Sequence, residues 1–164
     1  MAQVSVSIGS NLERERNIKN ALLALSKTFG VLSRSPVYES TAYGFDGPPF
    51  YNLVVIFETV LDVHAVRAEI QAIESLQGRE LGKARGGSRS LDLDLLLYGD
   101  DVCYDQGLDV PRREIFEHTY ILKPLADVLP TVTHPVTGES FGDIWARLGS
   151  RQEVLLIVDG LDLN

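Results

Sequence analysis

Asp92 and Asp94 stand one residue apart in the segment SRSLDLDLLL, residues 88–97. Leucines occupy the alternating positions 91, 93, 95 and 97, which is typical of a β-strand and places both carboxylates on the opposite face. Neighbouring carboxylates repel each other, so we expect a cation over them. The scattered Cys and His residues do not suit zinc, and carboxylate oxygens favour Mg²⁺. The alternative for this D-x-D pattern is a solvent-facing strand with two incidental acids.

Residues 78–90, directly before this strand, are basic and rich in glycine. Their charged side chains are Arg79, Lys83, Arg85 and Arg89 against Glu80. An arginine can hold phosphate oxygens through two parallel hydrogen bonds, and the glycines would let the loop open and close over a substrate. The alternative is a solvated loop whose arginines pair with Glu74 or Glu80. Beside a metal-binding pair, the segment favours binding of a polyphosphate.

The segment 39–52 offers a second kind of pocket. Its aromatic residues are Tyr43, Phe45, Phe50 and Tyr51. They could stack on a flat ring, and Asn52 could read the edge of that ring with one donor and one acceptor. The alternative is a small loop core that covers the edge of the sheet.

The composition indicates one soluble globular domain over residues 1–164, with 45% hydrophobic and 23% charged residues. A net charge of −8 argues against a nucleic-acid partner. The sequence contains no apolar run near the roughly 20 residues of a membrane helix and no basic leader, so we expect no membrane association. Cys103 is the single cysteine, which fits a reducing cytoplasm.

The periodicity predicts strands at 1–8, 31–38, 50–59 and up to Tyr98. Ser10 or Asn11 is expected to cap a helix that ends at Gly30, and Asp62 a second helix that ends at Gly78. The apolar face of the second helix is Val66, Ile70, Ile73 and Leu76. Pro36 places its strand at an edge or a bulge. Further helices are expected near 113–117, 121–128 and 141–148, and a last strand at 153–158.

This order, strand-helix-strand-strand-helix-strand, is that of a ferredoxin-like α+β fold. It predicts an antiparallel sheet with two helices packed on one face. The acidic strand and the basic loop would then meet at the end of the second helix.

Several motifs in this order resemble one family: residues 8–11 (IGSN), 38–40 (YES), 50–52 (FYN), 77–79 (QGR), 88–95 (SRSLDLDL), 98–99 (YG), 110–111 (VP) and 122–125 (LKPL). The chain is similar, to about residue 148, to the 6-hydroxymethyl-7,8-dihydropterin pyrophosphokinases of folate biosynthesis. The resemblance implies a three-layer αβα arrangement. It also implies transfer of pyrophosphate from ATP to the hydroxymethyl group of the pterin, with release of AMP.

The resemblance assigns roles to individual residues. Asp92 and Asp94 match the ligands of two Mg²⁺ ions, and Arg79 and Arg89 match loop arginines that hold the phosphates during transfer. On the ATP side it implies Gln71, Glu74, Arg85, Leu95, Arg112 and His118. On the pterin side it implies Ser40, Thr41, Tyr43, Phe50, Asn52 and Tyr120. The expected partners are these two small substrates, and the chain is expected to be a monomer.

Four departures from the family pattern lie on the ATP or loop side. Gly86 and Ser88 replace an aromatic residue and a proline, and Leu81 replaces an arginine. Arg112 replaces a histidine, and His118 stands where arginine is frequent. These changes leave two alternatives open: a diverged paralogue that binds pterin or nucleotide with weak or altered transfer, and an unrelated Mg²⁺-nucleotide transferase on the same fold.

Overall fold

The structure, a computed structural model, describes residues 1–42, 46–78, 91–149 and 155–164. Its strands are β1 (Ala2–Ser10), β2 (Ser33–Arg34), β3 (Val37–Ser40), β4 (Phe50–Thr59), β5 (Asp92–Tyr98) and β6 (Leu156–Val158). Its helices are α1 (Arg14–Phe29), α2 (Val63–Gly78), the short 3₁₀ helix η1 (Arg113–Phe116), α3 (Thr119–Val128) and α4 (Phe141–Leu148). Within these residues, no helix combines the length and the apolar character needed to cross a membrane.

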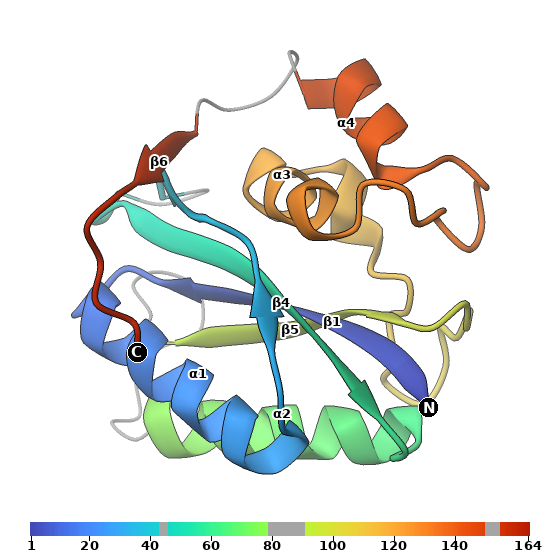
Figure 1. Cartoon of the computed structure of the whole chain (residues 1–164), viewed down its shortest axis with the longest axis horizontal. Helices are drawn as coiled ribbons and strands as arrows, with labels where there is room; N and C mark the ends of the chain where they lie inside the picture. The colour runs from blue at the N-terminus through green and yellow to red at the C-terminus, as the bar shows by residue number, and fades with distance from the viewer. Residues whose placement is uncertain (43–45, 79–90, 150–154) are drawn as a thin grey trace.

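One antiparallel sheet runs through the molecule in the order β5-β1-β4-β3-β6, and β2 also pairs with β4. Figure 1 shows α1 and α2 below this sheet and α3 and α4 above it. The predicted ferredoxin-like α+β fold is therefore confirmed. The downstream helices α3 and α4 cover the second face and complete three layers.

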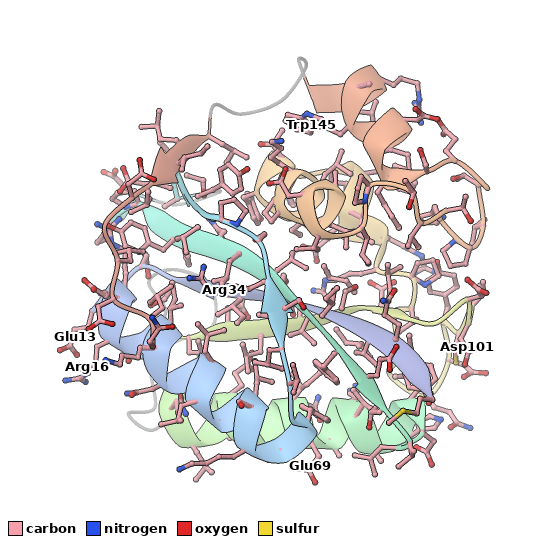
Figure 2. All side chains as sticks on the ribbon, in the orientation of Figure 1. Glu13, Arg16, Arg34, Glu69, Asp101 and Trp145 are labelled. Carbon is pink, nitrogen blue, oxygen red and sulfur yellow. The ribbon has the colours of Figure 1, made fainter. Side chains whose placement is uncertain are left out.

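Each face of the sheet has its own apolar core. On β1, Val4, Val6 and Ile8 belong to the core between the sheet and the helices α1 and α2. On β4, Val54 belongs to the core between the sheet and the helices α3 and α4. This core also contains residues of both helices, such as Leu122. Figure 2 shows Glu13, Arg16 and Glu69 at the outer side of the α1–α2 layer, and Trp145 across the sheet on α4. The alternation of each strand thus assigns its side chains to one layer or the other.

The start of α1 differs from the prediction. β1 continues to Ser10, and α1 follows Glu13, which has a left-handed φ of 42° and makes no side-chain capping bond. Ser10 Oγ donates to the carbonyl of Leu12 at 3.0 Å, while Asn11 Nδ2 donates to the carbonyl of Pro48 at 3.1 Å. The prediction of a cap at Ser10 or Asn11 is therefore wrong, because both side chains bind other backbone groups. The predicted end of α1 at Gly30 is confirmed.

The predicted strand at 31–38 is divided into β2 and β3. Ser35 and Pro36 separate them, and Pro36 has no N–H to donate to a ladder. Ser35 Oγ accepts a hydrogen bond from Val54 N at 3.0 Å, which ties the break to β4. The last strand, β6, covers only the end of its predicted range, 153–158: residues 153 and 154 lie outside the described residues, and Leu155 precedes the strand.

The expected apolar face of α2 is correct except at its last position. The three earlier members of the face are buried, whereas the Leu76 side chain is 70% exposed. Leu76 lies in the last turn of α2. Asp62 caps α2 as predicted, since its Oδ1 accepts from Ala65 N at 2.8 Å.

β5 contains one extra residue relative to β1. Val6 pairs with Leu95 and Ser5 pairs with Leu97, so Leu96 forms a β-bulge. The leucines up to Leu95 face the first core as predicted, but Leu96 and Leu97 both join the second core. The prediction for Leu97 is therefore wrong, because the bulge reverses the alternation.

Candidate active site

The strands β5, β1 and β4 are neighbours in the sheet (Figure 1), and their register brings Asp92, Gly9 and Asn52 side by side. Gly9 pairs with Asp92 on one side and with Asn52 on the other. A Cβ atom at Gly9 would lie 3.3 Å from Asn52 Oδ1, 3.8 Å from a ring carbon of Phe50 and 4.0 Å from the Cβ of Asp92. Gly9 therefore leaves the space between a carboxylate and an amide open. Sequence reasoning assigned Gly9 no role, although glycine inside a strand is a signal of close approach.

Asp92 and Asp94 share one face of β5, as the alternation predicted, and that face is the one covered by α3. A small cleft on that face is lined by both aspartates together with Asn52 and Tyr120. The acidic pair and two of the expected pterin residues therefore share one cleft.

Arg112, in the segment after β5, contacts the acidic pair through its guanidinium. Its Nη2 lies 3.3 Å from Asp94 Oδ1 and 3.0 Å from Glu114 Oε1. Its backbone N–H donates to the carbonyl of Leu96, the bulged residue, at 2.9 Å. The bulge thus supplies an anchor that fixes where the guanidinium reaches the acidic pair.

Asp94 is held in an environment that disfavours its charge. Burial raises its pKa to about 7, the nearby carboxylate of Asp92 adds to this rise, and Arg112 opposes it. Glu114 and Glu74 act in the same direction as Asp92. A site in which four carboxylates meet one arginine is suited to a divalent cation.

The donor set also limits the kind of ion. Within the described ranges, no group of three Asp, Glu, His or Cys side chains is placed to hold a metal. An ion on Asp92 and Asp94 would therefore complete its shell with water or substrate oxygens. This is the coordination typical of Mg²⁺ bound with a phosphate substrate.

Glu74 on α2 binds the backbone of the acidic strand β5. It lies on α2 with 6% of its surface exposed, and its Oε2 accepts from Leu93 N at 2.8 Å. Leu93 stands between the two aspartates at the edge of the sheet. The carboxylate of Glu74 therefore fixes the backbone that carries the acidic pair.

A cavity of about 180 Å³ adjoins the pair between α2 and the segment before η1. Its lining contains the expected ATP-side residues Gln71, Leu95 and Arg112, and also Asp94. Sequence reasoning missed Arg67 and Asp109, which also line it. His118 is not among the described lining residues, and its ring stacks on Tyr120 with centroids 4.7 Å apart. The structure therefore places His118 on the side of the expected pterin residues.

The expected pterin residues gather around Asn52. Asn52 Nδ2 donates to Ser40 Oγ at 2.8 Å, and both residues are buried. This bond orients the amide so that its oxygen faces Gly9. Phe50 lies on the same strand two residues before Asn52, while Thr41 follows β3 and is exposed.

Tyr51 does not belong to this group. It points to the opposite face of β4, and the guanidinium of Arg14 covers its ring at 3.7 Å from the centroid. Arg14 also contacts Glu39 at 2.9 Å and the carbonyl of Pro49 at 3.1 Å. The expectation that Tyr51 stacks on a ligand is therefore wrong. Arg14 was missed, and it secures the backbone directly before Phe50.

Several expected residues lie outside the described part of the chain. These are Arg79, Arg85 and Arg89 of the basic loop, Tyr43 and Phe45, and the departures at Leu81, Gly86 and Ser88.

Fold and site together define a ferredoxin-like α+β protein with an acidic metal-type pair beside an aromatic and amide pocket. The family model for 7,8-dihydro-6-hydroxymethylpterin-pyrophosphokinase (HPPK) matches residues 5–130. The chain belongs to this family, whose members are diphosphokinases of folate biosynthesis.

Named relatives agree with this assignment. A 2-amino-4-hydroxy-6-hydroxymethyldihydropteridine pyrophosphokinase of Aquifex aeolicus is 33% identical over 138 residues, which cover 83% of this chain and 86% of the relative. The folic acid synthesis protein fol1 of Pneumocystis carinii is 36% identical over 151 residues, which cover 88% of this chain. The match spans only 20% of fol1 and 31% of a bifunctional folate synthesis protein of Pisum sativum.

Solved structures agree in fold. An HPPK-DHPS structure of Plasmodium falciparum with pteroate superposes with a TM-score of 0.72 at 16% identity. The match covers 92% of this chain and 43% of that one. This likeness confirms the three-layer arrangement.

Proposed function

We propose that residues 1–164 form a single pyrophosphokinase domain that transfers pyrophosphate from ATP to the 6-hydroxymethyl group of 6-hydroxymethyl-7,8-dihydropterin. The pterin hydroxyl oxygen bonds to the β-phosphorus of ATP and loses its proton. The bond between the β-phosphorus and the oxygen on the α-phosphorus breaks, and AMP leaves. The family assignment supports this reaction, and the cleft supports the arrangement of the two substrates.

Asp92 and Asp94 are the residues that would hold two Mg²⁺ ions. When bound there, such ions would neutralise phosphate charge and align attacking and leaving oxygens. Arg79 and Arg89 would hold the phosphates from the basic loop, together with Arg85. The nucleotide would extend into the cavity lined by Gln71 and Leu95.

One observation carries the proposal: Gly9 separates Asn52 from Asp92 by the width of a single strand. A flat ring held at Asn52 would have its substituents directed across β1 toward the acidic pair. Phe50 and Tyr120 would stack on the ring, and Ser40 would orient Asn52 through their hydrogen bond. An acceptor hydroxyl and a metal-bound polyphosphate would then meet in one place.

A second candidate function is favoured by the ion pair between Arg112 and Asp94. A guanidinium on a metal-binding carboxylate competes with the ion, so transfer could be weak while pterin binding persists. The Nε of Arg112 is buried and has no hydrogen-bond partner among the described residues. A phosphate oxygen would satisfy this donor if the Arg112 side chain moved toward the adjoining cavity, which would favour the leading function.

The two candidates differ in one measurement. AMP release from ATP should depend on hydroxymethyldihydropterin and on Mg²⁺, and should vanish in the Asp92→Ala and Asp94→Ala proteins. Fluorescence titration with the pterin measures binding separately. Tight pterin binding without AMP release would favour the second candidate. Absence of both would refute the two together.

A further inference from the structure

Tyr38 is a buried tyrosine with a polar contact that the reaction above does not use. It lies on β3 with 4% of its surface exposed and pairs in register with Asn52 on β4. Paired residues share a face, so Tyr38 points to the same layer as Asn52, toward α3. Tyr38 is therefore a direct neighbour of Asn52, the residue proposed to bind the edge of the pterin ring.

The Tyr38 hydroxyl donates a hydrogen bond to the Asp127 carboxylate in the last turn of α3. Asp127 also accepts from Lys123 Nζ at 2.8 Å. The Lys123 ammonium in turn lies 5.4 Å from the centre of the Trp145 ring on α4, the labelled tryptophan of Figure 2. Burial and the Asp127 contact raise the pKa of Tyr38, so its hydroxyl remains a donor.

Tyr120, Lys123 and Asp127 lie along one stripe of α3, at spacings of three and four residues. The stripe links the aromatic ring at the start of the helix with the carboxylate at its end. The apolar contacts of α3 with the second core fix the distance of the helix from the sheet. They are not directional, so they do not fix the rotation of the helix about its own axis. A rotation of about 20° about the helix axis would move a ring roughly 6 Å from that axis by about 2 Å.

We propose that the hydrogen bond from Tyr38 to Asp127 sets the rotation of α3 and thereby the position of the Tyr120 ring over the pterin site. Tyr38 and Asp127 are positioning residues, and the inference rests on the proposed function. Lys123 keeps the Asp127 carboxylate oriented toward Tyr38. The recognised ligand is a flat ring held between Asn52 and Tyr120.

The test compares ligand affinities in three single variants and one double variant. Tyr38→Phe and Asp127→Ala should each raise the Kd for hydroxymethyldihydropterin five- to tenfold and leave the Kd for a non-hydrolysable ATP analogue with Mg²⁺ within twofold. Asp127→Asn retains an acceptor oxygen and should restore pterin affinity to within twofold of the unchanged protein. The double variant Tyr38→Phe/Asp127→Ala should be no weaker than either single variant, because both remove one contact.

Tyr98→Phe is the matched control. Its hydroxyl donates to the carbonyl of Leu61 at 2.6 Å, and its ring packs against the first core, away from the cleft. It should lower the melting temperature without changing pterin affinity. If the Tyr38→Phe protein is folded and binds pterin normally, the inference is refuted while the proposed function stands. If the unchanged chain binds no pterin, both fail.

Discussion

The guanidinium of Arg112 and the carboxylate of Asp94 form an ion pair beside the cavity that both residues line, with 3.3 Å between Nη2 and Oδ1. The Arg112 side chain is 22% exposed and that of Asp94 25%, so water only partly screens the pair. The proposed metal pair thus carries its own counter-cation. The contact explains how the fold tolerates adjacent carboxylates when no ion is bound.

Removing this counter-cation should strengthen metal binding. Arg112→Gln is expected to lower the Kd for Mg²⁺ alone about tenfold, because the ion no longer competes with a guanidinium for Asp94. Isothermal titration without nucleotide measures this. Arg113→Gln is the matched control, since Arg113 covers the Tyr104 ring at 4.0 Å and contacts neither aspartate in any described interaction. Weaker Mg²⁺ binding in Arg112→Gln would show that Arg112 supports the site instead.

The raised pKa of Asp94 predicts a pH dependence of stability. The pKa is about 7 in the fold against 3.8 for an exposed aspartate, so the native state binds the proton more tightly. Its contribution to the free energy of unfolding is full below pH 4 and is lost as the pH rises through 7. Asp94→Asn should therefore gain stability relative to the unchanged protein, by up to about 4 kcal/mol at pH 8.

Urea denaturation from pH 4 to pH 8 in chelator measures this difference. Asp101→Asn, at an exposed position after β5, reports the effect of removing a carboxylate outside the cleft. Added Mg²⁺ at pH 8 should stabilise the unchanged protein and not Asp94→Asn. A difference between the two proteins that does not vary with pH would contradict the assigned environment of Asp94.

Gly9→Ala should weaken pterin binding about tenfold with little loss of stability. The added methyl group would stand 3.3 Å from Asn52 Oδ1, in the space between the amide and Asp92. Pterin titration and thermal melting measure the two effects. Ser5→Ala on the same strand is the control, because the buried Ser5 hydroxyl has no partner among the described residues and its removal should be neutral. Unchanged pterin affinity in Gly9→Ala would exclude a ligand from that space.

Glu74→Ala should destabilise the protein by about 2 kcal/mol, because it leaves the buried Leu93 N–H without its acceptor. Glu74→Gln retains an acceptor oxygen and should lose less than half as much. Urea denaturation compares the two, and Mg²⁺ titration reports whether the strand between the aspartates has moved. Equal losses in both variants would indicate that the charge of Glu74, rather than its hydrogen bond, stabilises β5.

The sequence was informative where a feature depends on local periodicity. Alternation placed Asp92 and Asp94 on one face, and helical spacing found the buried side of α2 up to Ile73. Prediction from the sequence failed where pairing with another strand decides which face a side chain occupies. The reversal at Leu97 comes from a bulge against β1, and the role of Gly9 follows from its register with two neighbours.

Side-chain contacts with distant segments could not be predicted from local sequence patterns either. Ser10 and Asn11 have the residue types of helix caps, yet Asn11 binds Pro48, 37 positions away. Tyr51 has the residue type of a stacking aromatic, yet Arg14 covers it on the other face of β4. For Asn11 and Tyr51 the residue type was read correctly and its partner was not, because that partner comes from a remote segment.

The bulge at Leu96 also affects whether a further strand can pair with β5. β5 is an edge strand, and a regular edge presents backbone groups that another chain can pair with. Here the Leu93 N–H is bound by Glu74, and the Leu96 carbonyl is bound by the Arg112 N–H. The contacts that hold the acidic pair in place therefore also protect this edge from association with a further strand. Substitutions that free these two backbone groups would expose the molecule to aggregation along the same edge.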